Sequence, residues 1–142
     1  MKKLSEQELQ IKTKKRVKDH GEVFTAEREV KAMCDLIPKE VWSNIDSTFL
    51  EPSCGTGNFI VEILRRKFAL CMTPEDGIRA IRSVWGIELL MDNAVECRAR
   101  IFKLYAKTFP SANADDLTEA IAIARMHIIC GDALEIMKSW EE

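Results

Sequence analysis

The chain has 142 residues, of which 46% are hydrophobic and 31% charged, and its formal net charge is −2. This size and composition predict one globular domain with a real hydrophobic core. The near-neutral charge excludes the uniformly basic surface that is typical of many nucleic-acid-binding domains. No apolar run approaches the roughly 18 residues of a membrane span, and the N-terminus lacks a signal-peptide core, so we expect a cytoplasmic protein.

The five cysteines form an odd set without a C-x-x-C pair, and most lie within apolar patterns. We therefore expect buried free thiols in a reducing compartment rather than disulfides or zinc ligands. The two histidines, His20 and His127, stand in no metal-binding or nucleophile pattern. The sequence therefore predicts no metal site.

Residues 1–19 differ in composition from the rest of the chain. Residues 1–20 hold seven Lys or Arg against three Asp or Glu, which leaves 14 basic and 20 acidic residues for the remainder. We interpret 1–19 as a basic N-terminal arm, either a solvated tail or a DNA contact. Residues 20–142 are predicted to form the folded domain.

From residue 20 onward, segments with helical spacing alternate with short apolar runs. Thr25 is placed to cap a first helix, with acidic residues in its first turn. The apolar face predicted for that helix contains Val30, Met33, Cys34 and Ile37. Pro38 ends the helix or begins the next turn.

Three apolar runs, at 47–51, 83–88 and 126–130, are predicted to be strands. Helices are predicted at 57–69, 74–82, 90–107 and 115–125, with a short one ending near Trp140. Thr73 and Pro74 followed by two acidic residues form a strong helix start, and Asp115 or Asp116 is expected to cap the helix that ends at Arg125. This alternation predicts parallel strands joined by right-handed crossovers.

The first strand runs into a loop that contains two glycines and opens onto a helix. Phe49 and Leu50 end the strand, and the helical pattern begins at Asn58. Gly55 and Gly57 permit the positive-φ, close-backbone geometry that side chains resist. Free N–H groups at such a helix start make a nucleotide-type pocket.

Two common nucleotide motifs do not fit this loop. The dinucleotide fingerprint G-x-G-x-x-G would need a glycine where Ile60 stands, and a P-loop would need a lysine well before Lys67. The carboxylate of Glu51 at the strand tip would repel a phosphate but would attract a cationic or amine-bearing ligand. S-adenosylmethionine, which carries an ammonium and a sulfonium, fits this requirement.

The string from Glu51 to Phe59, EPSCGTGNF, resembles the cofactor motif of adenine-N6 DNA methyltransferases, especially the large restriction-modification methylases. Residues 21–25, GEVFT, resemble the upstream G-x-x-[FY]-T-P segment, although Ala26 replaces the usual proline. Residues 85–88, WGIE, and 128–134, IICGDAL, resemble the family's second and third strand tips. The similar segments follow the family order and span residues 20 to 134.

The resemblance implies an α/β, Rossmann-like methyltransferase fold with a partial parallel sheet of order 3-2-1 and helices on both faces. Glu88 would then hold the ribose hydroxyls and Asp132 the adenine amino group, while residues 24 and 25 would cover the methionine end. The predicted cofactor-binding residues are Phe24, Thr25, Glu51, Pro52, Ser53, Gly55, Gly57, Asn58, Glu88, Asp132 and Ala133.

Several of these residues also have a simpler interpretation. The glycines could serve only a tight turn, and Glu51 could cap the neighbouring helix. Glu88 could be a solvated carboxylate at a strand end, and Asp132 could cap the last helix. Phe24 could belong to the core.

The family transfers the methyl group with an [N/D/S]-P-P-[Y/F] loop, and none of the four prolines of this sequence stands in such a motif. We therefore expect the S-adenosylmethionine-binding part of an adenine-specific DNA methyltransferase, with no catalytic residue in this chain. The alternatives are a non-catalytic binding or interaction module, or one piece of a split methylase acting on RNA or protein. DNA would be bound through a separate target-recognition part. Because the strand at 47–50 would have a free edge, we also expect a homodimer or a partner chain.

Overall fold

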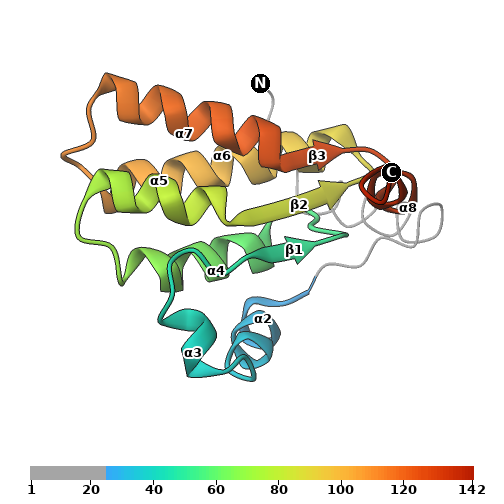
Figure 1. Ribbon diagram of the computed structural model, residues 1–142, viewed down its shortest axis with the longest axis horizontal. Coiled ribbons are helices and arrows are strands. Elements are labelled where there is room, and N and C mark those ends of the chain that lie inside the picture. Colours follow the sequence, from blue (N-terminus) through green and yellow to red (C-terminus); the bar gives the residue numbers. More distant parts are fainter. Residues whose placement is uncertain (1–24) are drawn as a thin grey trace, which may run out of the picture.

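The computed structural model describes residues 25–142 and has an α/β architecture (Figure 1). Strands β1 (Phe49–Glu51), β2 (Val84–Glu88) and β3 (Ile128–Cys130) form a parallel sheet in the order β1-β2-β3. The predicted strand order is therefore confirmed. The predicted arm at 1–19 and Phe24 of the upstream segment lie outside the described residues.

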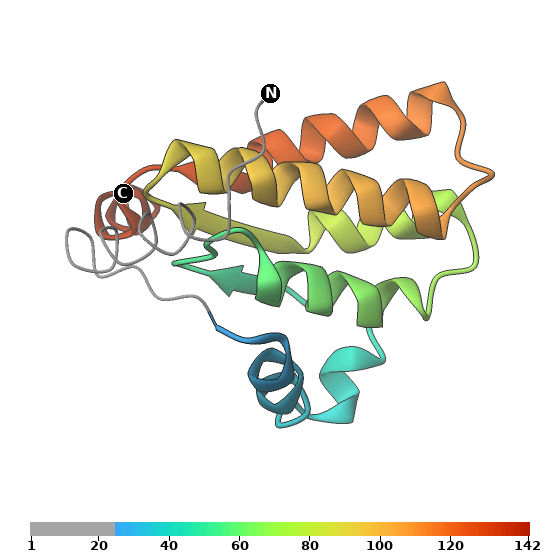
Figure 2. The ribbon, with the colours of Figure 1, turned by 180° about the vertical axis from the view of Figure 1, so that it is seen from behind.

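Two helices connect the strands and lie side by side on one face of the sheet (Figure 2). These are α4 (Asn58–Phe68) and α6 (Met91–Thr108), which pack against each other and against β2. Two further helices, α5 (Pro74–Arg82) and α7 (Ala114–His127), lead directly into β2 and β3 and pack against each other (Figure 1). Helices α5 and α7 thus extend the sheet layer beyond the short strands.

The core lies between these two layers. Its largest fully buried apolar side chains include Ile60 and Leu64 of α4 and Ile101 and Tyr105 of α6. Each buried side chain of this size contributes roughly 1.5–3 kcal/mol through burial. The Tyr105 hydroxyl donates to the Pro74 carbonyl oxygen at 3.0 Å, which ties the start of α5 to α6.

Lys67, near the end of α4, is fully buried, although the sequence places it beside two arginines at the favourable end of the helix dipole. Its Nζ donates to the carbonyl oxygens of Ile45 and Ser47 and, at 2.7 Å, to Ser83 Oγ. Burial lowers the pKa of Lys67 to about 8. The buried ammonium therefore joins the chain before β1 to the start of β2.

The helix start predicted at Thr73 is confirmed, because Thr73 Oγ1 accepts from the Asp76 N–H at 3.1 Å. The cap predicted for α7 is wrong. Asn113 caps this helix, since its side chain accepts from the Asp116 N–H while Asp116 accepts from the Asn113 N–H. This reciprocal pair satisfies two N–H groups at once, and it places the cap two residues before the predicted Asp115. Helix α7 also continues to His127, which shortens the predicted strand at its start.

Helix α2 (Glu27–Cys34) begins after Ala26, whose side chain can make no capping bond, so the predicted cap at Thr25 is wrong. Val30 and Cys34 are buried as predicted, whereas Met33 is 53% exposed. The short helix α3 (Lys39–Trp42) was not predicted, because four residues are too few to show helical periodicity. Trp42 at its end stacks on Phe49 of β1, with ring centroids 5.2 Å apart.

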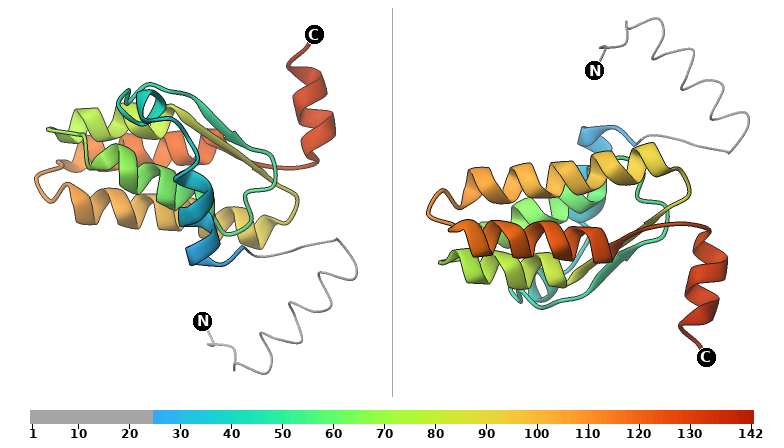
Figure 3. Two further views of the ribbon diagram at one scale, coloured as in Figure 1. Left: turned by 90° about the horizontal axis from the view of Figure 1, so that it is seen from below. Right: turned by 90° about the horizontal axis from the view of Figure 1, so that it is seen from above.

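The other face of the sheet is only partly covered. Leu50 and Trp85 are register partners on this face, and Leu50 is 43% exposed. Two aromatic side chains contact Trp85 on this face. The ring of His127, the last residue of α7, stacks on Trp85 with ring centroids 3.7 Å apart, and Trp140, which follows α8 (Ala133–Ser139), makes an edge-on contact. Figure 3 shows α8 projecting away from the helical layer. Within residues 25–142, helices thus cover one face, whereas the predicted second helical layer is represented only by these two aromatic contacts.

A shallow apolar hollow of about 390 Å³ lies on this open face, lined by Thr48, Leu50, Trp85 and Trp140. Within the described residues, β1 pairs only with β2, so its other edge is free. None of the helices in residues 25–142 combines the length and apolar character that a membrane span requires.

Candidate functional site

The loop after β1 has the backbone geometry that its glycines predict. Gly55 has φ +56° and Gly57 has φ +98°, and they are the only positive-φ residues in the described part of the chain. Gly57 is the N-cap residue of α4 and makes no side-chain bond there. The first N–H groups of α4 therefore face the loop without a capping side chain from Gly57.

The loop is fixed tightly to the sheet and to α6. The Cys54 N–H donates to the Ile87 carbonyl oxygen at 3.0 Å. A Cβ on Gly57 would lie 2.7 Å from Cys97 Sγ, and a Cβ on Gly86 would lie 3.0 Å from Cys54 Sγ. Both glycines are therefore needed for close packing, and the loop has little room to shift.

The turn after β3 is also hydrogen-bonded to the end of β2. The Gly131 N–H donates to the Glu88 carbonyl oxygen at 2.9 Å. The turn after β1 and the turn after β3 are thus both bonded to the last residues of β2. The carboxyl ends of the three parallel strands form one continuous edge.

A hollow of about 230 Å³ opens beside the loop, and it brings together five of the predicted residues. Its lining residues are Thr25, Glu51, Ser53, Cys54, Gly55, Thr56, Asn58 and Phe59. Thr25 joins this group from a distant segment, because its carbonyl oxygen accepts from Asn58 Nδ2 at 2.8 Å. The hollow is therefore built from the glycine loop, the β1 tip and the residues that precede α2.

Glu51 is the carboxylate of this hollow. It is half-buried, and its Oε1 accepts from the Ser53 N–H at 3.1 Å, a bond within its own turn. The suggested alternative, a cap on the neighbouring helix, is wrong because α4 has no side-chain cap. Burial raises the pKa of Glu51, and the bond from Ser53 only partly opposes this effect. A cation placed in the hollow would stabilise the ionised carboxylate.

Glu88 ends β2 and is only 6% exposed. The alternative reading as a solvated carboxylate is therefore wrong. Its oxygens lie 3.5 Å from the Leu90 nitrogen and 3.5 Å from Asn93 Nδ2, which are long contacts. Glu88 lies outside the lining of the hollow, and its predicted ribose contact stays a prediction.

Cys54 lies close to the thiol of Cys97, and both are buried. The neighbouring Cys97 thiol, burial, and the negative charges of Glu88 and Glu51 all raise the pKa of Cys54. All five cysteines are free thiols. Cys54 is therefore a packing residue beneath the loop and is held in its neutral form.

The remaining predicted residues lie outside the lining of the hollow. Asp132 is exposed, and its Oδ1 accepts from the Glu135 N–H at 3.1 Å, which confirms its reading as the cap of α8. Its adenine contact stays a prediction. Ala133 is the first residue of α8, and Pro52 is exposed in the turn after β1.

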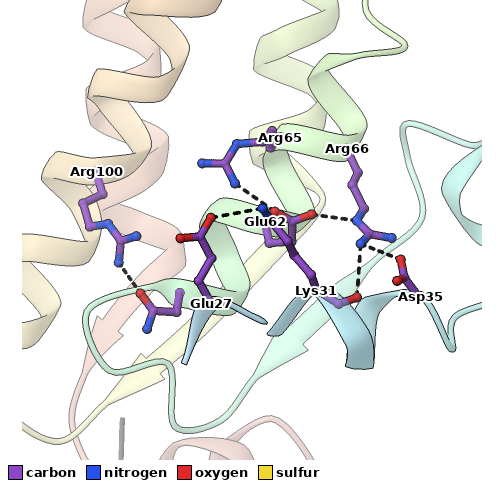
Figure 4. A network of polar contacts seen from close by, with 8 residues as sticks. Glu27, Lys31, Asp35, Glu62, Arg65, Arg66 and Arg100 are labelled. Atoms are coloured by element: carbon purple, nitrogen blue, oxygen red, sulfur yellow. Dashed lines mark hydrogen bonds and ion pairs between the residues drawn. The ribbon is translucent and has the colours of Figure 1, made fainter. Parts of the chain in front are cut away.

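Sequence reasoning missed Arg100, which approaches the loop from α6. Its Nη1 donates to the Thr56 carbonyl oxygen at 3.0 Å and to Asn58 Oδ1 at 2.8 Å. Figure 4 shows Arg100 beside the polar network of α2 and α4. No motif marks this residue, because it stands at an ordinary position of an amphipathic helix.

Comparison with known proteins gives no relative for this chain: no protein-family model, no curated protein and no solved structure matches it. The fold itself is α/β with a three-stranded parallel sheet.

Proposed function

We propose that this chain is the S-adenosylmethionine-binding part of an adenine-specific DNA methyltransferase of the restriction-modification type. The observation that carries the proposal is the hollow formed by the glycine loop, Glu51 and Thr25 at the carboxyl ends of parallel strands. Ligands of open parallel sheets bind at this edge.

The charge of the hollow supports a cationic ligand. Among residues 25–142, its lining contains one carboxylate, Glu51, and no Lys or Arg. A polyphosphate would meet this carboxylate without a lining cation, whereas an ammonium or sulfonium would be attracted to it. The resemblance of the loop to methylase cofactor motifs then favours S-adenosylmethionine among cationic ligands.

Residues at two strand tips next to the loop would supply the other contacts to the cofactor. Glu88 would exchange its two 3.5 Å contacts for charge-assisted bonds to the ribose hydroxyls. Asp132 would contact the adenine amino group while it also caps α8. Glu88 ends β2 and Asp132 follows β3, and the two strands are bonded here, since the Gly131 N–H donates to the Glu88 carbonyl oxygen.

For these 142 residues we propose cofactor binding without methyl transfer, because their sequence contains no [N/D/S]-P-P-[Y/F] motif. DNA recognition and an extruded adenine would require a separate part or partner chain. That part would position the adenine amino group in line with the sulfonium methyl.

Calorimetric titration tests the proposal. S-adenosylmethionine should bind in the micromolar range or more weakly, where a micromolar Kd corresponds to roughly −8 kcal/mol. Glu51→Gln, which keeps the shape but removes the charge, should weaken this binding. S-adenosylhomocysteine, whose sulfur is neutral, should lose less affinity in the variant. The proposal fails if S-adenosylmethionine does not bind, or if ATP binds equally well.

A second assay tests the absence of turnover. The purified chain is incubated with methyl-labelled cofactor and adenine-containing DNA, and the label in DNA is counted. We expect none above a no-protein control. Methyl transfer to adenine by this chain alone would contradict the no-turnover part of the proposal and leave the binding part intact.

A further inference from the structure

Arg100 connects three segments that are far apart in the sequence. Its Nη1 donates to the Thr56 carbonyl oxygen, 44 residues away, and to Asn58 Oδ1, 42 residues away. Asn58 Nδ2 then donates to the Thr25 carbonyl oxygen, 33 residues away, at 2.8 Å. Helix α6, the glycine loop and the entry to α2 thus meet in one hydrogen-bonded chain.

The chemistry of Arg100 fixes the orientation of the Asn58 amide. A guanidinium can only donate, so the amide oxygen must face Arg100. The amide nitrogen is then the atom that faces Thr25, where it finds a carbonyl acceptor. Only this orientation satisfies both neighbours, because the flipped amide would place two donors together and two acceptors together.

The second bond of Arg100 acts on the most adaptable part of the loop. Thr56 lies between the two positive-φ glycines, Gly55 and Gly57. Glycine has the largest conformational freedom of any residue, so a peptide between two glycines depends on outside contacts for its orientation. The bond from Arg100 to the Thr56 carbonyl oxygen supplies such a contact from a rigid helix.

Other cations of this region are already engaged with carboxylates. Glu62 pairs with Arg65 and Arg66, each at 2.8 Å, and Glu27 pairs with Lys31 at 3.1 Å (Figure 4). A small cavity of about 110 Å³ between α2, α4 and α6 is lined by both carboxylates and by Arg100. The carboxylates thus have their own partners, and the guanidinium of Arg100 serves the loop.

We propose that Arg100 is a positioning residue of the cofactor site. It orients the Thr56 carbonyl and the Asn58 amide, and through Asn58 it holds Thr25 against the hollow. The identity of the ligand rests on the function proposed above, whereas the effect on the loop does not. Arg100 contacts no lining group except Thr56 and Asn58 in the described bonds, so it acts on a ligand through them.

Three variants of α6 test this role by titration with S-adenosylmethionine. Arg100→Met keeps the aliphatic stem but removes the donors, and Arg100→Lys restores one donor. Lys103→Met is the matched control, because Lys103 is exposed on the same helix. We expect Arg100→Met to weaken binding about tenfold or more, Arg100→Lys to recover most of this loss, and Lys103→Met to leave affinity unchanged.

A measurement without cofactor tests the role of Arg100 independently of the proposed function. In NMR spectra, the Asn58 side-chain amide protons should exchange slowly in the wild type and about tenfold faster in Arg100→Met, with recovery in Arg100→Lys. If the wild type binds no S-adenosylmethionine, the proposed function fails and the exchange data still decide the role of Arg100. Unchanged exchange and affinity in a folded Arg100→Met protein would overturn the positioning role. The positioning role would also be overturned if the loss of affinity in Arg100→Met matched a loss of global stability in urea and Arg100→Lys did not restore it.

A second variant covers the case in which Arg100→Met does not fold. Asn58→Asp can still accept from Arg100 but cannot donate to the Thr25 carbonyl oxygen. Release of this bond should speed trypsin cleavage after the exposed Arg28 in the first turn of α2. Cleavage at the wild-type rate in Asn58→Asp would contradict the proposed link from Arg100 to Thr25.

Discussion

Glu51 and Glu88 stand at neighbouring strand tips, and the fold holds their carboxylates differently. Glu51 is half-buried, lines the hollow and accepts a bond from its own turn. Glu88 is 6% exposed and lies outside the lining, and its carboxylate has only 3.5 Å contacts to the described residues. The weak contacts leave Glu88 able to accept stronger donors, while Glu51 supplies the charge of the hollow.

Glu88→Ala should weaken S-adenosylmethionine binding about tenfold or more. The reason is the loss of charge-assisted bonds to the ribose, which contribute roughly 1.5–3 kcal/mol. Stability in urea should barely change, because the carboxylate has no short partner among its described bonds and removing a poorly paired buried charge costs little. Equal affinity of a folded Glu88→Ala protein and the wild type would remove the ribose assignment.

The affinity for S-adenosylmethionine should also depend on pH through Glu51. Burial raises the pKa of this carboxyl above the ordinary 4.5, so protonation begins at a higher pH than for a solvated glutamate. The cationic ligand prefers the ionised form, so affinity is full above the raised pKa and is lost as the pH falls through it. Titrations at a series of pH values should show this loss in the wild type. A similar loss in Glu51→Gln would assign it to another group.

At the scale of elements, local chemistry predicted some helix ends and failed at others. The start of α5 at Thr73 could be predicted because cap, proline and acidic residues all agree. The start of α7 was placed too late because Asn113 and Asp116 satisfy each other, which a single-residue cap does not anticipate. Thr25 was assigned to a cap, whereas its carbonyl oxygen is held by Asn58, 33 residues away. Such a long-range bond leaves no mark in the local sequence.

The junction between the glycine loop and α4 gives a prediction for Gly57→Ala. A left-handed backbone costs a non-glycine residue about 1–2 kcal/mol, and the new Cβ would also meet Cys97 Sγ at 2.7 Å. Urea unfolding should therefore show destabilisation of at least this size. Adding Cys97→Ala should recover only the part due to crowding. Stability equal to the wild type in Gly57→Ala would contradict the observed loop geometry.

For the whole molecule, alternating helices and strands were enough to predict a parallel sheet, whereas its strand order was predicted from the resemblance to the methyltransferase family. The sequence also indicated five residues that the structure gathers at one hollow: four lie within the glycine-containing motif, and Thr25 lies in the upstream segment that resembles the family. It did not indicate Arg100 or the buried Lys67, whose partners are distant carbonyl oxygens. Bonds to backbone oxygens require no particular residue type at the acceptor, so the sequence carries no sign of them.

The open face of the sheet gives a prediction about assembly. Leu50 is 43% exposed on β1, whose second edge is free within the described residues. We propose that a second copy covers this edge, since twofold dimers are the commonest symmetric solution. Sedimentation at tens of micromolar should show a dimer, and Leu50→Lys should shift it toward the monomer. A clean wild-type monomer that binds no hydrophobic dye would contradict this prediction.

S-adenosylmethionine is proposed to bind at the carboxyl ends of the three strands. Backbone amide NMR spectra recorded during a titration test this proposal most directly, because each residue reports separately. We expect shifts concentrated at Gly55, Gly57, Glu88 and Asp132. Shifts confined to another surface, such as the groove of Arg98 and Arg125 between α6 and α7, or no shifts at millimolar ligand, would contradict it.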